Sequence, residues 1–481
     1  MPYRDLREWL DALRENGELV EVKQQVDWDL EIGAITRHVY DTFAPAPLFT
    51  NIKDYPGHRI LAAPIGLSAR NRYARLALAL DLPADATLRE ITEEYLRRRQ
   101  KLIPPVLVSD GPCQENVLLG DDIDLLKFPV PLQHEGDGGR YIGTWHATVT
   151  KDPNTGWTNY GMYRLMVHDR NHMGGIVSTV QHFHQHFLTY QERNQRMEFA
   201  VVIGGEPLSS MMAATALPDF VSEADVVGGL RGEPLEVVQC KTVDLQVPAT
   251  AEIVIEGYIE PDELRAEGPF GEYTGYLASG RGKRPVYTVT AITHRNDSIL
   301  TMSCMGVPVD DSHVIMPVTE AAEVYRELRD GYGFPVDFVY IPPEGTSHLY
   351  VVGTKVPDTS YVNRLAMALW STKGGRIHCN SLIVVNDDID VTDMKQVIWA
   401  WTTRMHPIRG IWQVPNSFAS ALLPWPTPDE RAKRIGGRVL FDATWPFDWP
   451  KDWIPKTSSF EAAWPKEMQQ RVLQEWKNYG F

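Results

Sequence analysis

Two carboxylates flank a tight turn in the middle of the chain. Glu267 and Glu272 bracket the sequence Gly268-Pro269-Phe270-Gly271. Proline and glycine exclude a helix here, so the turn can bring both acids close together. Close carboxylates push their pKa values apart, and one that stays protonated near neutral pH can serve as a general acid. A cation such as Arg164 would hold the other ionised. A solvated acidic turn is the alternative interpretation.

A second group of residues could bind a divalent metal ion. Asn159, His182 and Glu223 offer an amide oxygen, an imidazole nitrogen and a carboxylate. This mixed set of oxygen and nitrogen ligands suits Mn²⁺ or Mg²⁺ better than zinc. The three residues come from separate segments, so the sequence alone does not show that they meet.

The run of residues 181–186, Gln-His-Phe-His-Gln-His, leaves open which histidines could bind a metal. His182 and His184 would share one face of a strand, whereas His182 and His186 would share one face of a helix. No glutamate of an HExxH motif accompanies them. We expect His182 alone to be a ligand, with His184 and His186 at the surface or at a helix start.

The segment Thr372-Lys373-Gly374-Gly375-Arg376 could hold a phosphate group. Glycine backbone N–H groups and the Lys373 ammonium would provide the contacts. The segment is not a Walker motif, because GxxxxGK[ST] is absent. A glycine cap at the C-terminus of a helix explains the glycines equally well.

Short β segments between residues 106 and 305 must position the first two groups. Two hairpins are predicted, 141–150 with 160–168 and 287–294 with 299–304. Further strands are expected at 237–240 and 253–259, and helical insertions near 186–197 and 222–230. Hairpin strands interrupted by helices predict a β-barrel with insertions.

The regions on either side combine helices and strands. Leu6, Trp9, Leu10 and Leu13 predict a helix that ends at Gly17, and further helices are expected near 69–80 and 88–100. After residue 317, helices near 320–330, 361–371 and 394–403 alternate with strands near 336–341, 349–353 and 381–386. The expected fold class is α+β, with units at residues 1–105, 106–317 and 318–481.

The C-terminal region is rich in tryptophan and proline. Nine of the 14 tryptophans lie between Trp399 and Trp476. Large aromatic surfaces on an extended, proline-fixed segment pack more often against another subunit than around a ligand. We therefore expect residues 425–464 to form an oligomer-contact arm in a protein that is at least a homodimer.

Composition narrows the class of protein further. The 481 residues carry a formal charge of −16, which disfavours non-specific binding to nucleic acid or anionic membranes. No apolar run approaches the ~18 residues of a membrane-spanning helix, and the first residues lack signal-peptide character. The four cysteines are far apart, so neither a disulfide scaffold nor a zinc site is expected. These features favour a cytoplasmic enzyme.

Taken together and in this order, the motifs resemble the UbiD family of decarboxylases, which use prenylated FMN. The most specific stretch is Ala251-Glu252-Ile253-Val254-Ile255-Glu256-Gly257 leading into Glu267-Gly268-Pro269-Phe270-Gly271-Glu272. Asn159-x4-Arg164, Gln181-His182 and Val221-Ser222-Glu223 stand at family-like spacing. The resemblance covers nearly the whole chain.

The resemblance implies a role for each motif. Arg164, Glu267 and Glu272 look like the catalytic network of the family. Asn159, His182 and Glu223 look like the ligands of a metal, Mn²⁺ or Mg²⁺, that joins the protein to the cofactor phosphate, and K⁺ is a further candidate ion. The residues that look like contacts of the cofactor are Asn159, Arg164, Gln181, His182, Glu223 and Lys373. The loop 308–313, with His313, is expected to form part of the substrate pocket.

The resemblance also implies an overall reaction and assembly. A split β-barrel would bind the flavin, and the C-terminal α/β unit would mediate oligomerisation into a homodimer or hexamer. The protein would reversibly and non-oxidatively decarboxylate an aromatic or heteroaromatic acid, releasing CO₂. The reaction would pass through a covalent adduct with prenylated FMN, supplied by a prenyl-FMN synthase, with Glu272 as the proton donor.

Two other functions stay open from the sequence alone. A flavin-dependent oxidoreductase could use the same split barrel, but hydride transfer has no evident need for the Glu267 and Glu272 pair, and no GxGxxG motif is present. A non-enzymatic assembly factor would account for the tryptophan-rich arm, and it would tolerate Glu272→Gln without loss of function.

Overall fold

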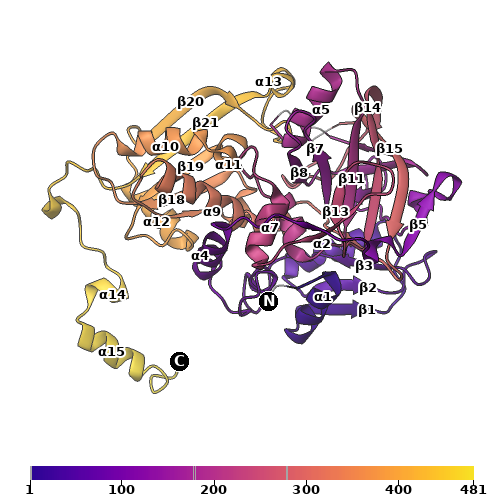
Figure 1. Cartoon of the computed structure of the whole chain (residues 1–481). Helices are drawn as coiled ribbons and strands as arrows, with labels where there is room; N and C mark the ends of the chain where they lie inside the picture. The colour runs from indigo at the N-terminus through magenta and orange to yellow at the C-terminus, as the bar shows by residue number, and fades with distance from the viewer. Residues whose placement is uncertain (1–2, 177, 179, 278–279) are drawn as a thin grey trace.

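The computed structural model describes residues 3–176, 178, 180–277 and 280–481 (Figure 1). Its N-terminal region begins with α1, whose apolar residues Leu6, Trp9, Leu10 and Leu13 are buried, as the sequence predicts. The Asp5 carboxylate accepts hydrogen bonds from the first free N–H groups of this helix and so caps it. The helices of this region are α1 (Leu6–Glu15), α2 (Glu31–Thr42), α3 (Ala74–Ala79) and α4 (Leu88–Arg99).

A four-stranded sheet lies beside α1, and α1 and α2 contact its strands (Figure 1). Its order is β1 (Leu19–Val22), β2 (Ala46–Phe49), β3 (Arg59–Ala62) and β16 (Ile299–Met302). The predicted hairpin of 287–294 with 299–304 is therefore wrong, because β16 pairs in parallel with β3. The buried Glu252 explains the departure: its carboxylate accepts the Ile299 N–H at 3.1 Å and directs the chain out of the hairpin.

The central sheet has nine strands and carries most of the predicted site. Eight follow the order β6-β9-β10-β15-β14-β11-β7-β8, and β5 pairs with β15. Within the described residues the end strands β6 and β8 do not pair with each other, so the sheet is an open half-barrel. The strands are β5 (Asn116–Leu119), β6 (Tyr141–Gly143), β7 (His146–Lys151), β8 (Thr158–Gly161), β9 (Leu165–Asp169), β10 (His172–Gly175), β11 (Met197–Ile203), β14 (Ile253–Glu267) and β15 (Gly282–His294).

The hairpin predicted around residues 152–156 is confirmed, because β7 and β8 are antiparallel neighbours. The insertions are α5 (His182–Glu192), α6 (Pro207–Ala213) and α7 (Glu223–Arg231). The helix expected near 186–197 thus begins four residues earlier, at His182. A small separate sheet combines β4 (Val106–Leu107), β12 (Glu236–Gln239) and β13 (Gln246–Pro248).

The C-terminal region surrounds a five-stranded sheet with helices (Figure 1). Its order is β17 (Val336–Tyr340), β18 (Leu349–Thr354), β19 (Ser381–Asn386), β21 (Ile435–Ala443) and β20 (Ile411–Phe418). Its helices are α8 (Asp311–Ile315), α9 (Thr319–Arg326), α10 (Tyr361–Ser371), α11 (Lys373–Ile377), α12 (Met394–Arg404) and α13 (Pro428–Lys433). The strands and helices predicted after residue 317 are confirmed, but β20 and β21 were not predicted.

The extended arm begins later than the predicted residue 425, because α13 and β21 belong to the C-terminal unit. Trp401 and Trp412 pack inside the C-terminal unit, with ring centroids 5.1 Å from Phe441 and 5.7 Å from Trp370. Beyond β21 the chain leaves the body, and α14 (Phe460–Ala463) and α15 (Lys466–Gln474) bury no residue (Figure 1). In the described part of the chain, no helix combines the length and apolar character needed to cross a bilayer.

Candidate active site

A buried arginine lies between the two predicted carboxylates. Arg164 comes from the loop between β8 and β9, Glu267 ends β14, and Glu272 lies in the connection from β14 to β15. Arg164 Nε and Nη2 donate to the two oxygens of Glu267, both at 2.9 Å, and Nη1 donates to Glu272 Oε1. The exposed fractions are only 7%, 1% and 4%. The turn is therefore a buried ion network and not a solvated surface feature.

One guanidinium cannot neutralise two buried carboxylates. Glu267 forms a bidentate pair with Arg164 and also accepts the Tyr141 hydroxyl at 2.8 Å, so three donors contact it, whereas one N–H of Arg164 reaches Glu272. Burial raises the pKa of Glu272, against the opposing effect of Arg164, and the Glu267 charge raises it further. The geometry thus favours a protonated Glu272, which can donate a proton.

A neighbouring loop holds the turn between the two acids. Asp137 Oδ1 accepts the Gly271 N–H at 2.9 Å, and its other oxygen lies 3.1 Å from His134 Nδ1. A Cβ atom on Gly271 would lie 2.6 Å from the His134 ring, so only glycine fits at this approach. These contacts fix the backbone from which Glu272 projects.

The three predicted metal ligands also meet. Asn159 lies on β8, whereas His182 and Glu223 are the first residues of α5 and α7. His182 Nδ1 is 3.1 Å from Asn159 Oδ1 and 3.9 Å from Glu223 Oε1. The other Glu223 oxygen accepts the Tyr160 N–H at 2.8 Å, which keeps Oε1 turned toward the histidine. One amide oxygen, one imidazole nitrogen and one carboxylate oxygen therefore converge.

The electrostatics of this group suit a cation. Burial raises the pKa of Glu223 to about 8. Burial and then the nearby Lys373 ammonium lower the pKa of His182 to about 4, so the imidazole is neutral, as a metal ligand must be. A divalent ion would offset the cost of burying the Glu223 charge. No group of three or more His, Cys, Asp or Glu residues in the described chain could hold a metal, so the Asn159 amide is essential to this set.

The surroundings of the same group suit an anion. The N-termini of α5 and α7 point their free N–H groups and positive dipole ends to this region. Lys373 Nζ contacts His182 Nε2 and lies 2.8 Å from Asp219 Oδ1. Cation ligands next to helix N-termini and a lysine are what a metal-bound phosphate requires. The described residues therefore fit the phosphate end of a flavin nucleotide together with its metal.

A cavity of about 250 Å³ adjoins both groups. Its lining includes all three metal-ligand candidates, Gln181 and Lys373, and also Tyr163 and Tyr273, the sequence neighbours of Arg164 and Glu272. Much of the remaining wall is apolar, from Met162, Ile176, Leu217, Met305, Met316 and Leu422. Such a wall suits flat aromatic rings.

Other predicted residues lie elsewhere. His186 is buried, not at the surface as expected, and its Nδ1 is 3.0 Å from Thr150 Oγ1, whereas His184 is half-buried. His313 is buried behind the cavity, with Nδ1 accepting the Asp310 N–H and Nε2 at 2.8 Å from the Tyr273 carbonyl oxygen. Its neighbour Ser312 lines the cavity in its place.

The two glycines after Lys373 serve helix packing. Thr372 caps the N-terminus of α11, so these glycines start a helix and do not end one. A Cβ on Gly375 would lie 2.0 Å from the Leu369 carbonyl oxygen, and one on Gly374 would lie 2.7 Å from the Glu320 side chain. Close packing of α11 thus explains both glycines and places Lys373 at the cavity.

Sequence reasoning missed the residues that support the site. Asp219 pairs with His182 Nε2 at 2.9 Å and with Lys373, and so orients both. Tyr141 and Asp137 hold the acidic turn. These residues form no sequence motif with their partners, because the partners are far apart in the chain. His182, for example, is 37 positions from Asp219 and 191 positions from Lys373.

Comparisons with known proteins agree with this geometry. The chain matches the N-terminal domain of 3-octaprenyl-4-hydroxybenzoate carboxy-lyase over residues 10–95, its Rift-related domain over 106–308 and its C-terminal domain over 313–443. It is 38% identical to pyrrole-2-carboxylic acid decarboxylase of Pseudomonas aeruginosa, covering 99% of this chain and 98% of that protein. It is 32% identical to ferulic acid decarboxylase 1 of Saccharomyces cerevisiae, covering 100% and 99%.

Solved structures show the same fold. The closed form of vanillic acid decarboxylase from Sedimentibacter hydroxybenzoicus is 29% identical, covers 99% of both chains and gives a TM-score of 0.89. An evolved dimeric form of the UbiD-class enzyme HmfF from Pelotomaculum thermopropionicum, in complex with prFMN, is 27% identical over 94% of this chain and 97% of that chain, with a TM-score of 0.78. The chain therefore belongs to the UbiD family of decarboxylases, which are carboxy-lyases.

Proposed function

We propose that the protein reversibly and non-oxidatively decarboxylates an aromatic or heteroaromatic carboxylic acid, with prenylated FMN as its cofactor. The observation that carries the proposal is the buried network in which Arg164 pairs with Glu267 and Glu272 beside the cavity. Asn159, His182 and Glu223 would hold a divalent metal, Mn²⁺ or Mg²⁺, against the cofactor phosphate, with K⁺ as a further candidate ion. Gln181 and Lys373 would contact the cofactor.

The chemical difficulty lies in the electron pair that CO₂ leaves on the ring carbon. This pair lies in the ring plane and cannot delocalise into the π-system, so the bound cofactor supplies the electron sink. The protein residues do the rest. Arg164 positions the substrate carboxylate, and protonation of Glu272 releases one of the guanidinium N–H groups for that contact. Glu272 then gives its proton to the ring carbon as the bond to CO₂ breaks, and solvent restores the proton.

Cofactor supply provides the direct test. Protein made without a prenyl-FMN synthase should be folded but inactive, whereas protein made with one should release CO₂ from an aryl acid. A panel of pyrrole-2-carboxylate, ferulate and vanillate, the acids named for the relatives, would be assayed with flavin content measured by mass spectrometry. Activity of the unprenylated preparation would instead favour the flavin-dependent oxidoreductase, which needs only ordinary FMN.

We also propose that the exposed tail joins subunits in a homodimer or hexamer. Trp453, Trp464 and Trp476 are 64%, 50% and 48% exposed, and the helices α14 and α15 of this segment bury no residue. Each buried aromatic side chain contributes on the order of 2 kcal/mol to association. Trp453→Ser with Trp464→Ser should therefore shift light scattering toward the monomer at micromolar concentration.

The control for the tail experiment is Ile408→Ser, which removes a 79% exposed apolar side chain outside the tail. This variant should keep the oligomeric state of the unmodified protein. A full-length chain that is monomeric at micromolar concentration, or a double variant that assembles normally, would contradict the assignment of the tail.

A further inference from the structure

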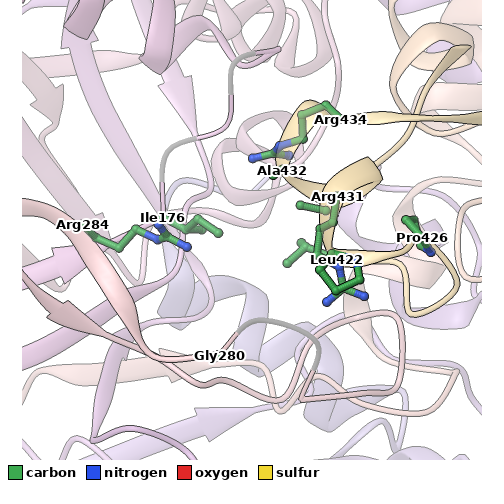
Figure 2. Close-up of a pocket in the computed structure, with 10 residues that line it drawn as sticks. Ile176, Gly280, Arg284, Leu422, Pro426, Arg431, Ala432 and Arg434 are labelled. Carbon is green, nitrogen blue, oxygen red and sulfur yellow. The ribbon is translucent and has the colours of Figure 1, made fainter. Parts of the chain in front are cut away.

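A second hollow lies between the central sheet and the β20–β21 region (Figure 2). This cleft has a volume of about 520 Å³. Ile176 and Arg284 approach it from the side of the central sheet, and Leu422, Arg431 and Arg434 approach it from the opposite side (Figure 2). We call it the arginine cleft.

The arginine cleft borders the cavity of the active site. Ile176, Ala421, Leu422 and Arg434 line both spaces. A small molecule that passes through the cleft would therefore reach the cavity without crossing a packed core. The cleft is consequently a candidate entrance for the substrate.

The charge of the cleft is opposite to that of the molecule. Three arginines line it, and none of its lining residues in the described chain is acidic, although the protein carries a formal charge of −16. A local positive site in an acidic protein raises the concentration of anions at that site. The cleft therefore favours the binding of a negatively charged ligand.

Two of these arginines lack the acidic partners that other arginines of the protein have. Arg284 Nη1 contacts only the Lys283 carbonyl oxygen at 3.2 Å, and its buried Nε has no partner among the described residues. For Arg434, no side-chain hydrogen bond or ion pair is present within the described chain. By contrast, Arg404 forms a bidentate pair with Asp388 at 2.8 Å, so the lack of an acidic partner is not shared by all arginines of the protein.

The two guanidinium groups also act on each other. Burial lowers the pKa of Arg434, and the positive charge of Arg284 lowers it further. An anion between the two groups would relieve this repulsion and satisfy their free N–H donors. Arg431 has a structural role, because its Nη2 donates to the Leu423 carbonyl oxygen at 3.1 Å and so orders the adjoining loop.

We propose that Arg284 and Arg434 form a capture site at the entrance to the cavity, which binds the carboxylate of the incoming aromatic acid before it reaches Arg164. The guanidinium groups match a carboxylate in charge and geometry, and Ile176, Leu422 and Pro426 offer apolar surface for the ring. The identity of the anion rests on the proposed function. The phosphate of the cofactor has the same chemistry, and the experiment separates the two sources.

The test uses the cofactor-loaded enzyme and the variants Arg284→Met, Arg434→Met and their combination, each normalised to its bound flavin. At low ionic strength the double variant should lose about tenfold in kcat/KM, at the lower end of the range for electrostatic steering, with a much smaller change in kcat. Its kcat/KM should also lose most of its dependence on salt. Arg434→Lys, which keeps the charge, should retain most of the kcat/KM.

Arg409→Met provides the matched control, because Arg409 is an exposed arginine outside the cleft. It should keep both kcat/KM and its salt dependence. Binding of benzoate and of the neutral analogue benzamide, measured by calorimetry on the flavin-loaded protein, adds a readout without turnover. The double variant should bind benzoate more weakly and bind benzamide with unchanged affinity. This result is expected even if no acid in the panel proves to be a substrate.

Two results would overturn the inference. The first is an unchanged kcat/KM, salt dependence and benzoate affinity in the folded double variant. The second is a double variant that loads less flavin yet keeps normal kcat/KM per flavin, which would assign the arginines to capture of the cofactor phosphate. If either Met variant fails to fold, as judged from its melting temperature, the Arg284→Gln and Arg434→Gln variants carry the same comparison.

Discussion

Replacement of Glu272 by glutamine should lower turnover by about 10²–10⁴-fold, the range for a positioned general acid. Glutamine is nearly isosteric with glutamate and can still contact Arg164, so the turn and the cavity should keep their shape. Only the transferable proton is lost. Metal and flavin content should therefore equal those of the unmodified enzyme, while incorporation of solvent deuterium into the product falls in parallel with turnover.

The pH dependence gives an independent readout of the same residue. Because burial raises the pKa of Glu272, its protonated form persists to higher pH than that of an exposed glutamate. A proton donor is active in its protonated form, so turnover should decline as the pH rises through this raised pKa. The decline should be absent from the residual activity of Glu272→Gln.

Glu267→Gln is the matched comparison, since it alters the other acid of the same turn. It removes the anion that accepts hydrogen bonds from Arg164 Nε and Nη2, so substrate positioning as well as catalysis should suffer. A Glu272→Gln enzyme with near-normal turnover and deuterium incorporation would refute the proton-donor assignment.

The acidic turn was predictable because its information is local. Gly268-Pro269-Phe270-Gly271 excludes a helix and brings Glu267 and Glu272 to one cation, as the structure confirms. The supporting residues were not predictable in this way. Tyr141 reaches Glu267 across 126 positions and Asp137 reaches Gly271 across 134, and neither residue type at such a distance forms a recognisable pattern.

Errors in the predicted fold have equally specific causes. The spacing of residues 287–304 is that of a hairpin, but the buried Glu252 accepts the Ile299 N–H, and β16 is buried on both faces, as parallel strands commonly are. The strand β20 was missed because Pro415 argues against a strand. It is tolerated because β20 is the edge of its sheet, where a missing donor costs little.

The candidate metal ligands were predictable only in part. Residue types alone suggested Asn159, His182 and Glu223, but their meeting depends on where α5 and α7 begin. The predicted start of the first helix was displaced by four residues, and the actual start makes His182 its first residue. The N-terminus of the helix and the imidazole therefore face the same space. No spacing rule applied to the sequence predicted this arrangement.

His182→Ala should remove the metal and the flavin together. The imidazole is the only nitrogen donor of the set, and loss of even an indirect partner of a metal ligand costs 10–100-fold in metal affinity. We therefore expect a loss of at least that size for the ligand itself. Metal content by mass spectrometry and bound flavin by absorbance would be measured on the same preparation, with the melting temperature as the test of folding.

His184→Ala is the control, because it removes a histidine of the same helix from outside the cavity and should leave both contents unchanged. The informative comparison is between the two losses. Lys373, Asp219 and the N-termini of α5 and α7 remain in His182→Ala, so any affinity for phosphate that is independent of the metal survives there. If the metal joins the chain to the phosphate, these groups should not suffice, and flavin should fall with the metal. Stoichiometric flavin in metal-free His182→Ala would show instead that the lysine and the helix N-termini bind the phosphate directly.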